Sequence, residues 1–273
     1  MGLFSMNYSK PGPGISKDEP KKKPFFRFFE LFFRKFWDLA KLNLLFSVPV
    51  IIVFVLTGLL NSFTNINYIL TLPMILISPF VAGLTYVTRN YAKEDHAFIL
   101  SDFLSAIKNN WLAFLINGIV FYMVYNIFTI AFSFYSTQAR TNSLYVFPLF
   151  VSIVFFGLFL FSQYYVPVMI ITFDLKLTQI YKNSFIFSIL GLWRNLLLTL
   201  ILGIFYFIFY IMIQLMPLTF LIASAIMLFN FFAFSMFLIN FTAFPLVNKT
   251  MIEPYQAQKP NVDIDSDFQD DVK

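Results

Sequence analysis

The sequence has no cysteine, and His96 is its only histidine in 273 residues. Without cysteine, disulfides, thiolate metal ligands and cysteine nucleophiles are excluded. One histidine cannot supply the two imidazoles that an HExxH metal site needs, and no GxSxG or P-loop pattern is present. The cluster Glu94–His96 is typical of a solvated turn that opens a helix. The sequence therefore predicts no enzymatic activity, no cofactor and no metal site.

Charge is also scarce. Only 12% of the residues are charged and 59% are hydrophobic, with a mean hydropathy of +0.75, whereas a soluble domain carries about 25% charge. Four stretches contain no Asp, Glu, Lys, Arg or His: residues 42–88, 111–139, 141–173 and 195–248. Unbroken apolar runs of this length indicate a membrane protein, because a helix needs about 20 apolar residues to cross a bilayer.

Six apolar runs are predicted to cross the membrane as helices, at 42–60, 68–87, 111–134, 145–172, 196–216 and 218–247. Helices are favoured over barrel strands because the runs lack alternation of polar and apolar residues. The predicted fold class is an all-α, polytopic membrane bundle over residues 42–247, with amphipathic helices on its cytoplasmic side. A flexible basic tail at 1–23 precedes it, and an acidic tail at 248–273 follows it.

The basic residues give an orientation. Of nineteen Lys and Arg residues, only Arg140 falls on one side of the six predicted spans. By the positive-inside rule the other side is cytoplasmic, so both termini of this multi-pass protein are expected there. The formal net charge of +5 does not indicate nucleic-acid binding, because the basic residues flank spans and form no soluble patch.

Residues 24–41 are predicted to form an interfacial helix that lies in the membrane surface. Its charges step by three or four residues and so share one narrow stripe, with aromatic and aliphatic residues elsewhere. Segments 95–110 and 178–190 have a similar pattern. These helices would either brace the bundle or present a docking surface to a partner. The stripe consists of Arg27, Glu30, Arg34, Asp38 and Lys41.

A weak threefold repeat is visible in the same segments. Trp37, Trp111 and Trp193 each stand near the start of an odd-numbered span, and each even-numbered span carries a proline near its charged end. The repeated unit would be an interfacial helix followed by a helical hairpin. The alternative is that six-span proteins commonly place Trp at interfaces and Pro near helix ends.

Amides are the strongest polar groups inside the predicted spans. They can form hydrogen bonds between helices, or they can line a path for an uncharged polar solute. Ion-coupled carriers usually keep an ionisable group inside the bundle, and none is found in these spans. The candidate intramembrane polar residues are Asn117, Asn126, Gln163, Gln214, Asn230 and Asn240.

Several segments together resemble the YesL-like family of bacterial membrane proteins. These are YSKPGPG from Tyr8, FFRKFWDLAKLNLL from Phe32, PFVAGLTYVTR from Pro79 and SDFLSAIKNN from Ser101. The stretch TFDLKL from Thr172, near KNSF from Lys182, also fits. Members are poorly characterised and are often encoded beside carbohydrate ABC importers. The resemblance implies a helper role in sugar uptake and supplies no functional residues.

The sequence therefore leaves two alternative functions open. The first is a non-enzymatic accessory or stabilising protein that contacts the permease or ATPase subunits of a carbohydrate ABC importer. The second is a small permease for an uncharged polar solute. Besides the bilayer, such an importer is the predicted partner. The candidate docking residues are Arg27, Glu30, Arg34, Asp38, Arg89, Asp102, Asn109 and Asn110.

Overall fold

The computed structural model describes residues 23–64 and 66–258, and the regular elements of these residues are all helices. Of the predicted tails, residues 1–22 and 259–273 lie outside the described part. In chain order the elements are α1 Pro24–Arg34, α2 Phe36–Thr64, η1 Asn67–Thr71, α3 Pro73–Leu76, α4 Ser78–Lys93, α5 Ile99–Gln138, η2 Ser143–Tyr145, α6 Val146–Ser162, α7 Val166–Thr172, α8 Leu177–Leu190, α9 Leu192–Leu215, α10 Pro217–Ile226, η3 Met227–Phe231, α11 Phe232–Val247, η4 Asn248–Ile252 and α12 Glu253–Gln258.

The helices of the described chain confirm the predicted all-α membrane fold. Five are long and apolar enough to cross a bilayer: Phe36–Thr64, Ile99–Gln138, Ser143–Thr172, Leu192–Leu215 and Pro217–Tyr255. A sixth span results if Tyr68–Leu76 and Ser78–Lys93 count as one, since they meet at a bend of 43°. Each is at least as long as the roughly 20 residues that a bilayer requires.

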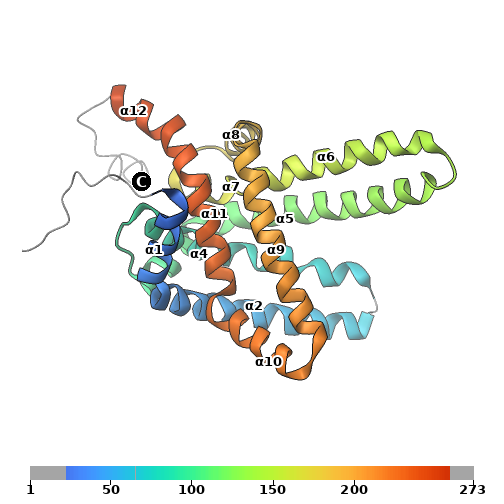
Figure 1. Ribbon diagram of the computed structural model, residues 1–273, viewed down its shortest axis with the longest axis horizontal. Coiled ribbons are helices and arrows are strands. Elements are labelled where there is room, and N and C mark those ends of the chain that lie inside the picture. Colours follow the sequence, from blue (N-terminus) through green and yellow to red (C-terminus); the bar gives the residue numbers. More distant parts are fainter. Residues whose placement is uncertain (1–22, 65, 259–273) are drawn as a thin grey trace, which may run out of the picture.

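The spans form three helical hairpins that diverge from a common packed region. The first consists of α2 with α3 and α4, the second of α5 with α6, and the third of α9 with α10. In Figure 1 the α5–α6 hairpin extends to the right, whereas the turn between α9 and α10 lies at the bottom. The packed region, where α1, α4 and α11 gather, lies on the left of the view.

Two apolar clusters form the core of this region. In the first, Phe28 and Leu31 of α1 pack with Leu42 of α2, Leu84 of α4 and Phe237 of α11. The second joins α4, α5, α7, α8 and α11. Helices α4 and α5 come especially close, because Gly83 lies against the Phe103 ring and carbonyl. Absence of a side chain at that position permits this contact.

The interfacial helices differ from the prediction in their boundaries. Helix α1 ends at Arg34 rather than Lys41, and the rest of the segment begins α2. The break at Lys35 turns α1 so that Phe28 and Leu31 reach α11. The predicted segment 95–110 is not separate: its residues 99–110 form the first part of the 40-residue α5, and residues 95–98 precede the helix. No Gly or Pro interrupts the chain before Trp111.

The returning spans are all interrupted, and proline lies close to most of the breaks. Pro79 stands in the first turn of α4, Pro167 in the first turn of α7, and Pro245 within α11, shortly before the π-helical η4. Proline cannot donate a backbone hydrogen bond, so it favours such breaks. The helix of the last span continues beyond the predicted boundary at Val247 and ends at Gln258.

Candidate functional site

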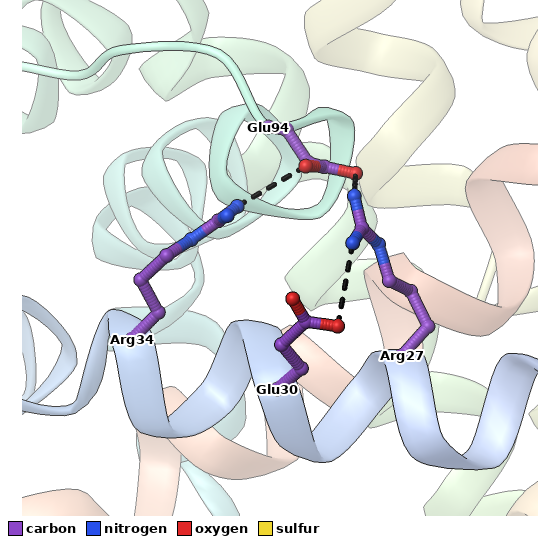
Figure 2. A network of polar contacts seen from close by, with 4 residues as sticks. All are labelled: Arg27, Glu30, Arg34 and Glu94. Atoms are coloured by element: carbon purple, nitrogen blue, oxygen red, sulfur yellow. Dashed lines mark hydrogen bonds and ion pairs between the residues drawn. The ribbon is translucent and has the colours of Figure 1, made fainter. Parts of the chain in front are cut away.

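The most concentrated charges of the described chain join α1 to the end of α4. Glu94 lies between two arginines of α1: its Oε1 accepts from Arg27, and its Oε2 accepts from Nη2 of Arg34 at 3.1 Å. Arg27 also donates from Nη1 to Oε2 of Glu30 at 3.4 Å. Figure 2 shows all four side chains pointing toward one another between α1 and the α4 end. We name these four residues the α1 clamp.

Glu94 is held in an unusual backbone conformation. It caps α4 with a φ of 67°, the one positive φ of a non-glycine residue in residues 23–64 and 66–258. Left-handed backbone is common at helix C-termini but usually at Gly or Asn. Burial of the carboxyl disfavours its charge, but hydrogen bonds and charge from Arg27 and Arg34 outweigh burial, so the pKa of Glu94 is lowered.

Helix α1 has three distinct faces. One carries the α1 clamp, and a second is buried against α11, with the Phe28 ring 5.4 Å from that of Phe237. The third face is aromatic and open, and consists of Phe25, Phe26, Phe29 and Phe33, which are 67%, 62%, 39% and 68% exposed. Helix α1 thus presents one face to the protein, one to apolar surroundings and one charged face to water. This distribution is expected of a helix that lies in the membrane interface.

The remaining predicted docking residues do not form one surface. Asp38 pairs with Lys35 at 3.8 Å and Lys41 at 3.6 Å. Asp102 accepts the backbone N–H of Phe98 at 2.8 Å and so caps the start of α5. Asn110 donates to the Ala106 carbonyl of its own helix, and Asn109 is exposed.

Arg89 is buried and has a packing role in the structure. Its Nη1 donates to the Ile171 carbonyl at 3.0 Å and lies 3.1 Å from the Thr172 hydroxyl. Its Nη2 donates to Oδ1 of Asn90 at 2.9 Å, and the guanidinium lies over the Tyr86 ring. A cation at this position satisfies the Ile171 carbonyl in the last turn of α7 and opposes the negative end of the helix dipole.

The six intramembrane amides are dispersed through the bundle. Asn240 donates to the Thr85 carbonyl and the Thr88 hydroxyl, at 3.3 and 2.6 Å. Asn126 donates to its own helix at the Tyr122 carbonyl, and Gln214 is exposed near the end of α9. Within the described residues, the buried Nε2 of half-buried Gln163 and both polar side-chain atoms of Asn230 have no hydrogen-bond partner.

Two further asparagines form hydrogen bonds that connect different elements. Neither was among the predicted site residues. Asn43, fully buried on α2, accepts from the backbone N–H groups of Phe232 and Ala233 at 2.8 and 2.9 Å. It donates to the carbonyls of Met227 and Leu228 at 2.8 and 2.7 Å. Asn195 accepts from the Tyr165 hydroxyl at 2.8 Å. The available sequence signal was that Asn43 lies inside the predicted span 42–60 and Asn195 immediately before the span 196–216.

An apolar cavity of about 440 Å³ lies between α2, α3, α4 and α5. Its lining includes Val50 and Phe54 of α2, Met74 of α3, and Phe121 of α5. Asn117 is one of two polar residues in the lining. Its Oδ1 accepts from the Tyr181 hydroxyl at 2.6 Å.

The second polar residue of the cavity, Ser78, has no free donor. Its hydroxyl lies 2.8 Å from the carbonyls of both Ile75 and Phe114. Elsewhere in the described chain, no group of three or more His, Cys, Asp or Glu side chains is placed to hold a metal ion. The arrangement therefore offers one charged clamp and one apolar cavity with an amide in its wall.

Part of the chain matches a known family model. Residues 39–132 match the model described as "Protein of unknown function, DUF624". The match runs from the start of α2 through α4 and most of α5, and so includes the cavity-lining segments of these helices, Arg89 and Glu94. Comparison with curated proteins and with solved structures gives no match.

Proposed function

We propose that this chain is a non-enzymatic accessory or stabilising protein whose α5–α6 hairpin packs against the membrane subunits of a carbohydrate ABC importer. The observation that carries the proposal is the isolation of this hairpin. No residue from Ile119 to Leu160 is buried. The two helices contact each other, with Phe128 and Phe156 stacked at 4.0 Å, and they project from the rest of the bundle (Figure 1).

A projecting hairpin is well suited to helix–helix association. In a bilayer, such association depends on van der Waals packing rather than on removal of apolar surface from water. The outer surface of α6 offers bulky side chains for this purpose, with Phe147, Phe150 and Phe155 at 74%, 63% and 61% exposure. This surface supports a docking role.

The resemblance to the YesL-like family supports the choice of partner. The family match over residues 39–132 is compatible with that resemblance. On this proposal the protein lies in a bacterial plasma membrane, with α1 and the α4–α5 loop at the cytoplasmic face. The basic residues of α1, α8 and the ends of α4 and α9 support this orientation through the positive-inside rule.

The alternative of a permease for an uncharged polar solute has less support. Of the six intramembrane amides, only Asn117 lines the cavity. The others lie apart from it, so they do not form a continuous polar path. A sugar in the cavity would leave most of its hydroxyl groups without partners, which is costly in an apolar site.

Affinity purification of the full-length chain from native membranes in a gentle detergent tests the proposal. Mass spectrometry should identify the permease or ATPase subunits of an ABC importer with the wild-type chain. The double substitution Phe150→Ala and Phe155→Ala on α6 should weaken recovery, because it removes the packing surface.

A matched control lies on the α9–α10 hairpin. Leu200 and Phe207 of α9 are 59% and 62% exposed, so Leu200→Ala with Phe207→Ala removes similar apolar surface and should leave recovery unchanged. Equal loss with both double variants would contradict the assignment of the interface to α5–α6. Recovery of the wild-type chain alone would contradict the proposed function itself.

A further inference from the structure

We propose that the cavity between α2, α3, α4 and α5 binds one acyl chain of a membrane phospholipid, with the ester carbonyl accepting a hydrogen bond from Nδ2 of Asn117. This inference does not depend on the proposed function. It rests on the size and lining of the cavity, on its position within the spans, and on the unused donor of a buried amide.

The lining excludes water and polar solutes as occupants. At about 440 Å³, the cavity falls within the range of small-molecule sites, about 300–1,000 Å³. A buried water typically needs two to four polar partners, and Ser78 already bonds to backbone carbonyls. An empty cavity of this size would leave its walls without dispersion contacts. A hydrocarbon chain supplies those contacts.

The position of the cavity favours a ligand from the bilayer. Its walls belong to stretches without charged residues, and Phe54 in its lining is 53% exposed on the surface of α2. An acyl chain can therefore enter from the surrounding lipid. Asn117 belongs to one of these uncharged stretches, six residues along α5 from Trp111.

The amide of Asn117 points to an oxygen on this ligand. The residue is only 8% exposed, and its Oδ1 is engaged by Tyr181. No described residue accepts from its Nδ2, and this atom is not among the fully buried polar atoms without a partner, so the donor lies next to accessible space. Among the components of a phospholipid, the ester carbonyl is the acceptor closest to the acyl chain.

Photocrosslinking of the full-length chain tests the site. The protein is reconstituted in phosphatidylcholine vesicles that contain phosphatidylcholine with a diazirine in the acyl chain. After irradiation, peptides are mapped by mass spectrometry. Labelling should concentrate on the cavity-lining parts of α2, α3 and α5. Uniform labelling over the exposed helices, such as α6, would overturn the proposal.

Four substitutions separate binding from folding. Val50→Phe fills the cavity and should abolish its labelling, whereas Val55→Phe on the exposed side of α2 should not. Asn117→Leu should lower labelling about threefold, the effect of one intramembrane hydrogen bond. Tyr181→Phe removes the partner of Oδ1 but keeps Nδ2, and should leave labelling unchanged.

Each outcome bears on the proposal. Persistent labelling in Val50→Phe would place the lipid outside the cavity and overturn it. Equal loss in Asn117→Leu and Tyr181→Phe would show that the amide acts only on packing, and would overturn the assigned hydrogen bond. Thermal unfolding of each variant in detergent verifies folding. Should Val50→Phe fail to fold, the Asn117 and Tyr181 pair still decides the question.

Discussion

At the scale of single residues, buried asparagines fix the positions of elements that are distant in the chain. Asn43 illustrates this most fully, because its amide makes four hydrogen bonds to η3 and the start of α11. The α-helical pattern gives way to a π-helix at Met227–Phe231. The Asn43 amide satisfies the backbone groups around this segment, which explains how the irregular turn is accommodated inside the bundle.

Replacement of Asn43 should therefore destabilise the fold. In Asn43→Leu the backbone groups of η3 and α11 lose their partners in a fully buried site, and we expect a loss of about 2–3 kcal/mol. Asn126→Leu is the control, because Asn126 bonds only to a carbonyl of its own helix. Thermal unfolding in detergent measures both; equal stability of the two variants would refute the assigned role of Asn43.

The α1 clamp should depend on pH. Because the pKa of Glu94 is lower in the folded chain than its ordinary value of 4.5, the clamp stabilises α1 docking above that value. The stabilisation is lost as the pH falls through the folded pKa. Glu94 is partly exposed, so the effect concerns local docking rather than the whole fold.

A spin label at Phe26→Cys reports the loss of α1 docking. The label attaches at this position alone, because the natural sequence contains no cysteine. The label should be less mobile at about pH 7 than at about pH 3. In Glu94→Gln it should be mobile at both values. The same label at Phe150→Cys, on α6, controls for general acid effects, and identical pH responses at both positions would argue against a specific clamp.

At the scale of elements, the close contact between α4 and α5 holds the packed region together. A Cβ at Gly83 would lie 2.4 Å from Cδ2 of Phe103 and 2.7 Å from its carbonyl oxygen. Gly83→Ala should thus cost about 1–3 kcal/mol, as overpacking does elsewhere. Gly157→Ala meets nothing within 4 Å and should be neutral or slightly stabilising. Thermal unfolding in detergent compares the stability of the two variants. Similar stability would contradict the tight contact between Gly83 and Phe103.

The sequence predicted the elements that depend on local composition. Apolar length placed the spans, because hydrophobicity over about 20 residues is itself the physical requirement. It did not predict the π-helix η3, which is accommodated by Asn43, 184 residues from Met227. It also predicted the charged stripe of α1 but not the partner of Arg27 and Arg34. Glu94 belongs to another element, and only the tertiary arrangement brings it there.

The candidate site shows the same division. Asn117 was predicted as an intramembrane polar residue from its type and position, and it lines the cavity. The cavity itself is lined by residues of five helices that are distant in the chain, so no local pattern indicates it. Arg89 was predicted as a docking residue by its place at the end of a span. That place also put it beside the carbonyl end of α7, a contact that depends on how α4 and α7 pack.

At the scale of the whole molecule, the orientation is open to a direct test. The absence of cysteine allows single cysteines to be introduced at opposite ends of the bundle. In intact cells a membrane-impermeant maleimide should label Asn142→Cys, in the α5–α6 turn, but not His96→Cys, in the α4–α5 loop. In permeabilised cells the maleimide should label both cysteine variants. Labelling of His96→Cys in intact cells would reverse the orientation that the basic residues predict.

The length of α5 has a mechanical consequence. Its 40 residues extend about 60 Å at 1.5 Å per residue, twice the roughly 30 Å of hydrocarbon in a bilayer. Its first part packs tightly against α4, whereas the part beyond the cavity-lining Phe121 projects from the bundle together with α6 (Figure 1). A continuous helix has no joint, so a small tilt at the gripped end becomes a larger sideways swing at the tip near Gln138. Helix α5 can thus pivot at its contact with α4 and transmit that movement to the α5–α6 turn.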